Sequence, residues 1–315
     1  MLQDREFLWL NGIVLGLLSL GSIIGFVLSR QDLGESAKKV VANLNARMRG
    51  WWVMTFVFLV SMFLGPTGAV LLFAFMSFLA LREFLTLAPT AAGDHRALVW
   101  AFFVVVPIHY LVLWTGWYGL FAILIPVYVF LILPIRAAAA GETERFLERT
   151  SIIQWALMIC VYCVSHAPAI RLLLPIPDDK THGGKLLMFF VVVCELCDVL
   201  QYVFGKLFGK HPVAPTVSPG KTWEGLIGGV VATVLIGAGL WWVTPFSPLQ
   251  AAGMSLAIGL MGFGGGLVMS AIKRDRGVKD WGSSIAGHGG MLDRIDSLCF
   301  AAPVFFHLTR YYFVP

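Results

Sequence analysis

The sequence predicts an all-α integral membrane protein that forms a single polytopic domain over residues 1–315. Of its 315 residues, 58% are hydrophobic and only 13% are charged, whereas soluble domains carry about 25% charged residues. The apolar residues fall into runs bounded by charge, proline or glycine, and most runs are long enough for a transmembrane helix. Composition and pattern therefore indicate the same class.

Ten apolar runs are expected to form membrane-spanning helices. Residues 1–172 contribute an N-terminal group, and residues 185–315 contribute the helices and loops that carry the polar motifs. A helix needs about 20 residues to cross the hydrocarbon core, so the second and third runs are short. Gly65-Pro66-Thr67-Gly68 predicts a tight turn between those two, and a re-entrant hairpin is the alternative. The runs are 7–29, 51–65, 67–81, 97–114, 117–135, 151–172, 185–204, 224–243, 251–270 and 297–314.

The basic residues predict the orientation of these runs. With ten alternating spans, 18 of the 23 Lys and Arg residues fall in loops on one side. Such a bias marks the cytoplasmic side, so both termini are expected outside and the polar cleft is expected to face the cytoplasm. The basic loops are 30–50, 82–96, 136–150, 205–222 and 271–296.

The first of these loops, 30–50, alternates basic and apolar residues at near-helical spacing. This pattern predicts either an amphipathic helix lying on the anionic inner leaflet or a solvated basic loop.

A first polar block occupies residues 195–229. Glu195 and Asp198 stand three apart in an apolar run and would share one face of a helix. Ionisable groups inside a span usually mark a functional cavity. The Gly-Lys pairs at 205–206 and 209–210, and Ser-Pro-Gly-Lys-Thr at 218–222, place lysines and hydroxyls before the next helix. Such an arrangement suits phosphate, although ordinary interfacial lysines and a helix N-cap would give the same pattern.

The Gly-Lys-Thr sequence at 220–222 is not a P-loop. That motif needs glycine at position 215, where this chain has Pro215, and no strand is predicted before it.

A second polar block, residues 270–296, holds five cations, four carboxylates and a histidine between two apolar runs. Carboxylates at a membrane surface need a cation, and Mg²⁺ suits them because it bridges carboxylates and phosphates. Asp293 and Asp296, at i and i+3, are expected to point the same way, and His288 is a candidate acid, base or phosphate donor. A salt-bridged cytoplasmic loop is the alternative.

This block, S-A-I-K-R-x4-K-D-x-G-x2-I-x2-H-G-G-M-x-D-R-I-D, resembles the signature of the phosphatidate cytidylyltransferases, or CDP-diacylglycerol synthases. Asp198, the two Gly-Lys pairs and S-P-x-K-T-x-E-G from Ser218 to Gly225 resemble that family's other block. The resemblance covers about 120 C-terminal residues, and the N-terminal runs match only in being hydrophobic.

The resemblance implies the reaction of CTP with phosphatidate to give CDP-diacylglycerol and pyrophosphate. It also implies Mg²⁺ with a monovalent cation such as K⁺. In that reaction the lipid phosphate attacks the α-phosphorus of CTP, so the protein supplies placement and charge neutralisation. No nucleic-acid partner is expected.

The resemblance also assigns roles to residues. The catalytic group comprises Asp280, Asp293, Asp296 and His288. The metal-binding group comprises Asp198, Asp280, Asp293 and Asp296. The substrate-binding group comprises Lys221, Ser218, Thr222, Lys273, Arg274, Lys279 and Arg294.

Three positions depart from the family pattern, namely Gln201, Gly220 and Ala286. None of them removes a carboxylate, so the departures bear on the lipid substrate rather than on the chemistry. Two other functions stay open: a CTP-dependent transferase acting on a polyprenyl or ether-lipid phosphate, and an ion-coupled transporter using Glu195 and Asp198. GxxxG spacings such as Gly225/Gly229 fit a homodimer seam as well as internal packing.

Overall fold

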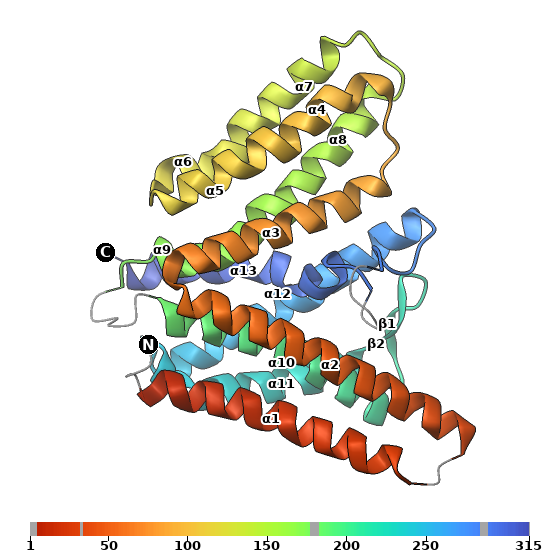
Figure 1. The fold of residues 1–315 in the computed structure, drawn as a ribbon, viewed down its shortest axis with the longest axis vertical. Coiled ribbons are helices and arrows are strands. Elements are labelled where there is room, and N and C mark those ends of the chain that lie inside the picture. The colour runs from red at the N-terminus through yellow and green to blue at the C-terminus, as the bar shows by residue number, and fades with distance from the viewer. Residues whose placement is uncertain (1–4, 32–33, 177–182, 284–288, 315) are drawn as a thin grey trace.

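A computed structural model describes residues 5–31, 34–176, 183–283 and 289–314 (Figure 1). Helices dominate the fold, and the β-structure in the described ranges is one short antiparallel hairpin. The first nine α-helices are α1 (Arg5–Ser29), α2 (Glu35–Phe63), α3 (Gly65–Thr86), α4 (His95–Trp100), α5 (Val106–Trp114), α6 (Tyr118–Ile123), α7 (Phe130–Ala138), α8 (Phe146–Leu157) and α9 (Val164–Leu172). The remaining elements are α10 (Gly184–Phe208), β1 (Pro212–Ala214), β2 (Ser218–Thr222), α11 (Trp223–Gly239), α12 (Pro248–Asp275) and α13 (Leu292–Phe313).

Three helix pairs are continuous rods joined by one wide, π-helical turn. These turns are Ala101–Val105 between α4 and α5, Leu124–Val129 between α6 and α7, and Met158–Cys163 between α8 and α9. Pro126 lies inside the second turn and Pro107 follows the first. Proline has no backbone N–H to donate, which favours such local widening.

The helices are those of a multi-pass membrane protein. Seven helical segments of the described chain are long and apolar enough to cross a bilayer. α11 is apolar but shorter, α2 carries charged residues in its first half, and α13 carries them near both ends. Every apolar run predicted from the sequence coincides with a helical segment, which confirms the all-α membrane class. The seven segments are Arg5–Ser29, Gly65–Thr86, Ala92–Trp114, Tyr118–Ala138, Phe146–Leu172, Gly184–Phe208 and Pro248–Asp275.

The segment 30–50 differs from both sequence-based alternatives. Most of it forms the first half of α2, a 29-residue helix that continues without a break into the apolar run. Asn45 Nδ2 donates to the carbonyl of Gly25 at 3.3 Å, so this basic half packs along α1. It is therefore neither a separate surface helix nor a loop.

The second and third runs form longer helices than hydropathy suggested. α3 has 22 residues because it continues through Arg82 and Glu83, two charges that end the apolar run. The tight turn is confirmed: Gly65, with φ of +80°, reverses the chain between α2 and α3. Glycine adopts this left-handed conformation at little cost because it lacks a Cβ atom. The re-entrant hairpin is thus replaced by two long helices.

The C-terminal helices pack around one another and carry the polar blocks. α10 packs on α11 and α12, and α12 packs on α13. α3 and α9 pack against each other and contact α13, which joins this group to the N-terminal half. Figure 1 shows α4 to α8 on the far side of α3 from α10 and α11.

At one end of the molecule, basic side chains join helices that are distant in the sequence. Arg171 Nη1 on α9 donates to the carbonyl of Gly65 at 3.0 Å, in the turn between α2 and α3. Arg310 Nη1 on α13 donates to the carbonyl of Leu173 at 3.1 Å. Lys185 Nζ at the start of α10 lies 2.5 Å from a carboxylate oxygen of Glu6 in α1. These contacts bring the beginning of the chain, the end of α9 and the last turn of α13 to the same end.

Candidate active site

Three carboxylates from two distant helices share one polar interior. Glu195 and Asp198 on α10 interact electrostatically with Asp296 on α13, and all three are only partly exposed. The side chain of Ser297 contacts Asp198, and its backbone N–H donates to Asp296 Oδ1 at 2.8 Å. We call Glu195, Asp198 and Asp296 the acidic cluster. Uncompensated carboxylates inside a membrane protein are costly, so their proximity requires cations.

Three cations surround the acidic cluster: Lys221 on β2, Lys273 on α12, which interacts with Asp296, and Arg294 on α13 itself. Lys221, on β2, interacts with Asp198 and Asp296, and its Nζ lies 4.8 Å from the centre of the Phe263 ring on α12. Arg294 interacts with all three carboxylates, and its Nε is buried without a hydrogen-bond partner among the described residues. These cations offset the charge of the acidic cluster, and Arg294 keeps a guanidinium N–H that is open to an acceptor.

Glycines allow the helices around this site to approach closely. A Cβ atom added at Gly265 of α12 would lie 2.6 Å from the carbonyl oxygen of Asp296. One added at Gly266 would lie 2.8 Å from Lys221 Nζ. Any larger side chain at these positions would displace α13 or the lysine, so the small residues on α12 are needed for the geometry.

The β-hairpin positions Lys221. Thr222 is the N-cap of α11, and its Oγ1 accepts from the N–H of Gly225 at 3.1 Å. Glu224 in the first turn accepts from the N–H groups of Lys210 and His211 at 3.1 and 3.2 Å. These bonds tie the end of α10 to the start of α11. Thr222 therefore has the N-cap role that the sequence left as an alternative, while Lys221 beside it extends to the acidic cluster.

Asp293 holds the second polar block together. Its Oδ1 lies 2.7 Å from Lys273 Nζ on α12, and its Oδ2 accepts from the N–H groups of Trp281 and Gly290 at 2.8 and 3.0 Å. Both side chains of the ion pair are buried, with 11% and 5% exposed. Although Asp293 and Asp296 are one turn apart, Asp293 bonds to the loop before α13 and Asp296 joins the acidic cluster.

Glu83 is a functional candidate that the sequence reasoning missed. It lies at the end of α3 and is 4% exposed. Its two carboxylate oxygens accept from the N–H groups of Met291 and Leu292, each at 2.9 Å. The charge caps the first turn of α13 from a distant part of the chain. The available signal was the pair of charges, Arg82 and Glu83, at the end of an apolar run.

Phe84, the next residue, stacks on Trp281 with ring centres 5.0 Å apart and an interplanar angle of 18°. α3 therefore supports the second polar block by a capping carboxylate and by an aromatic contact. The N-terminal half of the chain, which matched the family only in being hydrophobic, takes part in building the site.

The predicted site residues thus separate into groups. Those brought together around the acidic cluster are Asp198, Asp296, Lys221, Arg294 and, through its pair with Asp293, Lys273. Three other predicted residues are exposed: Arg274 at the end of α12, and Lys279 and Asp280 on the segment that follows it. Ser218 and Thr222 belong to β2 and the α11 cap. His288 lies outside the described residues.

The donor set fits Mg²⁺ when substrate phosphates complete it. Within residues 5–31, 34–176, 183–283 and 289–314, no group of three or more Asp, Glu, His or Cys side chains can hold a metal ion. Mg²⁺ nevertheless binds commonly through one or two carboxylates, waters and substrate phosphates. The neighbouring carboxylates of Asp198 and Asp296 provide that minimum, and their oxygens suit a hard cation.

Comparison with known proteins identifies the family. The sequence profile of the cytidylyltransferase family matches residues 45–312. The chain belongs to this family. Its match to cytidylyltransferases supports the prediction that the protein is a nucleotidyltransferase, and the alternative that it is a transporter is dropped.

Individual relatives differ in how much of the chain they match. An uncharacterized protein, YnbB of Escherichia coli K12, is 41% identical over 92% of this chain and 95% of its own length. A phosphatidate cytidylyltransferase of Haemophilus influenzae is 32% identical over 64% of this chain and 67% of its own length. One from Staphylococcus aureus COL is 36% identical over 40% of this chain and 50% of its own length.

Proposed function

We propose that this protein is a phosphatidate cytidylyltransferase that converts CTP and phosphatidate into CDP-diacylglycerol and pyrophosphate. The observation that carries the proposal is the acidic cluster faced by Lys221 and Arg294 inside a helical membrane protein. A site of this kind suits a substrate pair that brings several phosphates and one lipid.

In this reaction an oxygen of the lipid phosphate bonds to the α-phosphorus of CTP while the bond to the β-phosphate breaks. The nucleophile is already an anion, so no covalent enzyme intermediate is required. Lys221 and Arg294 hold the phosphates by charge and hydrogen bonds, and the open Nε of Arg294 is a donor for one phosphate oxygen. Asp198 and Asp296 would hold Mg²⁺, which would supply charge neutralisation for the phosphates. K⁺ is the proposed monovalent ion.

Two further positions act on the site through the backbone in this proposal. Asp293 and Glu83 hold the start of α13, which carries Arg294 and Asp296. They are positioning residues, because their carboxylates are bonded to Lys273 and to backbone N–H groups rather than directed at the cluster.

We also propose the orientation of the protein in the bacterial inner membrane. Ten helical rods, with each of the three π-joined pairs counted as one, would cross the bilayer and leave both termini outside. The hairpin and the second polar block would then face the cytoplasm, where CTP is available. Single cysteines at positions 210 and 279 should react with a membrane-impermeant maleimide only in inverted vesicles. Labelling of the two positions from opposite sides would contradict a shared cleft.

The experiment that tests the activity is pyrophosphate release by purified protein in detergent with labelled CTP. Release with phosphatidate, together with labelled CDP-diacylglycerol, supports the proposal, and no release with any lipid phosphate contradicts it. Asp296→Asn is the matched inactive control, because it removes one charge at nearly constant volume.

A second lipid substrate has one observation in its favour. YnbB, which is uncharacterized, matches 92% of this chain, whereas the phosphatidate enzymes above match 64% and 40%. A polyprenyl or ether-lipid phosphate is therefore the second candidate, and the same assay with those lipids selects between them.

A further inference from the structure

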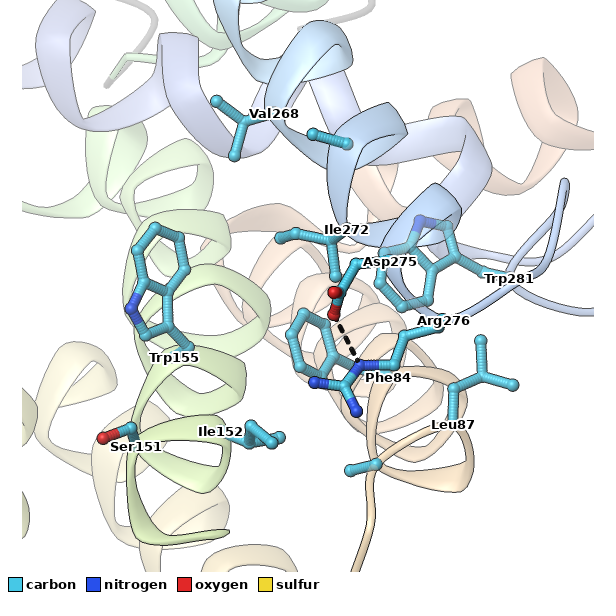
Figure 2. A pocket seen from close by; sticks show the side chains of 12 residues that line it. Phe84, Leu87, Ser151, Ile152, Trp155, Val268, Ile272, Asp275, Arg276 and Trp281 are labelled. Atoms are coloured by element: carbon cyan, nitrogen blue, oxygen red, sulfur yellow. Dashed lines mark ion pairs between the residues drawn. The ribbon is translucent and has the colours of Figure 1, made fainter. Parts of the chain in front are cut away.

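A cavity lies beside the second polar block, and Trp281 is part of its lining. Its volume is about 280 Å³. Its walls come from the end of α3, the second half of α8 and the last turns of α12, and Trp281 closes one side (Figure 2). The lining is aliphatic and aromatic, with the Asp275–Arg276 ion pair at one edge.

The cavity has the features of a site for an apolar chain with an anionic head. Trp155, on α8, is 50% exposed and lines it, so the apolar lining continues onto an outer surface of the helices. Figure 2 shows the guanidinium of Arg276 extending toward Ile152, between the α8 and α12 walls. Asp275 Oδ2 lies 3.2 Å from Arg276 Nε, and Glu148 on α8 also interacts electrostatically with this guanidinium.

The size of the cavity restricts its occupant. Pockets that enclose drug-sized ligands measure about 300–1,000 Å³, so this one accommodates part of one acyl chain rather than a whole diacyl lipid. Arginine binds phosphate with its planar fork of N–H groups, and an arginine above an apolar pocket matches a phospholipid's chemistry.

The cavity also adjoins residues that bond to Asp293. Trp281 lines the cavity with its ring while its backbone N–H donates to Asp293. Ile272 and Lys273 are neighbours on α12: Ile272 lines the cavity, and Lys273 pairs with Asp293. A lipid seated here would place its head group close to Trp281 and Lys273, in the second polar block.

We infer that the cavity between α3, α8 and α12 binds one acyl chain of the lipid substrate, with Arg276 contacting the lipid phosphate. The identity of that lipid as a phosphate monoester rests on the proposed function. Arg276 is then a specificity-determining residue, and the aliphatic wall of α12 is the chain-binding surface.

The test uses the full-length protein in nanodiscs and a phosphatidate probe with a diazirine in one acyl chain. Cross-links should map to the peptides that contain 151–155 and 268–272, and excess phosphatidate should compete, whereas phosphatidylcholine should not. Ala271→Trp, which fills the cavity from α12, should remove most of this labelling. The matched control is Leu260→Trp, which adds the same ring on α12 at a residue that is 49% exposed and outside the cavity.

Turnover gives a second readout. Arg276→Gln should raise KM for phosphatidate about tenfold, the effect of losing one charge-assisted hydrogen bond, and leave KM for CTP unchanged. The inference would be overturned if the cross-links mapped elsewhere, or if excess phosphatidylcholine reduced the labelling as well as phosphatidate does. Labelling of the cavity without turnover on any lipid would leave this site standing and refute the proposed reaction, while turnover with no labelling there would refute the site alone.

Discussion

Asp293 and Asp296 lie one helical turn apart in the same motif, yet the structure predicts opposite consequences for their removal. Asp293→Ala leaves Lys273 as a buried, unpaired cation, which costs about 3–5 kcal/mol in comparable buried pairs. It also orphans the N–H groups of Trp281 and Gly290, each worth about 1–3 kcal/mol when buried. These contributions overlap, so a loss of at least about 3 kcal/mol in unfolding free energy is expected.

Asp296→Asn should behave differently. The substitution preserves volume and the acceptor for the N–H of Ser297, and it removes one of three mutually repelling carboxylates. The free energy of unfolding should change by no more than about 1 kcal/mol, while turnover is lost. SDS-induced unfolding in mixed micelles, followed by tryptophan fluorescence, measures both variants on the same scale.

A double variant tests whether the fold depends on the charges of the ion pair. Lys273→Met with Asp293→Leu replaces the pair by apolar side chains and should recover much of the stability lost in Asp293→Ala, since buried pairs often exchange neutrally for apolar residues. Asp280→Asn, on the exposed segment after α12, is the matched control and should lie within about 0.5 kcal/mol of the wild type. Wild-type stability in Asp293→Ala, or equal destabilisation in Asp296→Asn, would refute the assignment of the two carboxylates.

Three further outcomes are expected. Lys221→Ala should raise KM for CTP by about tenfold or more, because one charged phosphate contact is lost, without altering the choice among lipid phosphates; a changed lipid preference would move this lysine from the nucleotide to the lipid. Glu83→Ala should lower the free energy of unfolding by about 1–3 kcal/mol and should affect kcat more than KM, because the variant uncaps α13 without touching substrate. Glu83→Gln keeps an acceptor and should recover part of the lost stability and part of the lost kcat. Unchanged stability and kcat in both variants would contradict the capping role. Chelation by EDTA should abolish turnover and Mg²⁺ should restore it, with binding of labelled phosphatidate retained throughout; full activity in EDTA would remove the metal from the proposal.

Much of the fold followed from local patterns. Hydropathy located every helical segment, and the spacing of charges separated the basic loops from the end that holds Arg171 and Arg310. The errors arose where a helix outlasts its apolar run: α2 begins in the basic segment and α3 ends in a buried glutamate. Hydropathy cannot detect such extensions, because the extra turns are stabilised by contacts with α1 and α13 rather than by lipid.

For the site, the two polar blocks and most of their residues could be named in advance, because phosphate chemistry restricts which side chains can serve. Asp198, Lys221, Arg294 and Asp296 do meet. The sequence motif could not show which of the two α13 carboxylates, Asp293 or Asp296, belongs to the acidic cluster. The i and i+3 spacing places Asp293 and Asp296 on one face of an isolated helix, but the loop before α13 folds back and engages only Asp293.

The sequence by itself determined the membrane class, the placement of the apolar segments and the family chemistry, because hydropathy and short motifs are local properties of the chain. Only the tertiary structure decided that Glu83 caps α13, that Lys273 pairs with Asp293, and that an apolar cavity opens beside Trp281. Those features depend on how separate helices cross, whether 20 residues apart, as for Lys273 and Asp293, or 209 apart, as for Glu83 and Leu292. The crossing of α12 and α13 is set by close packing at positions such as Gly265, which no local pattern reveals.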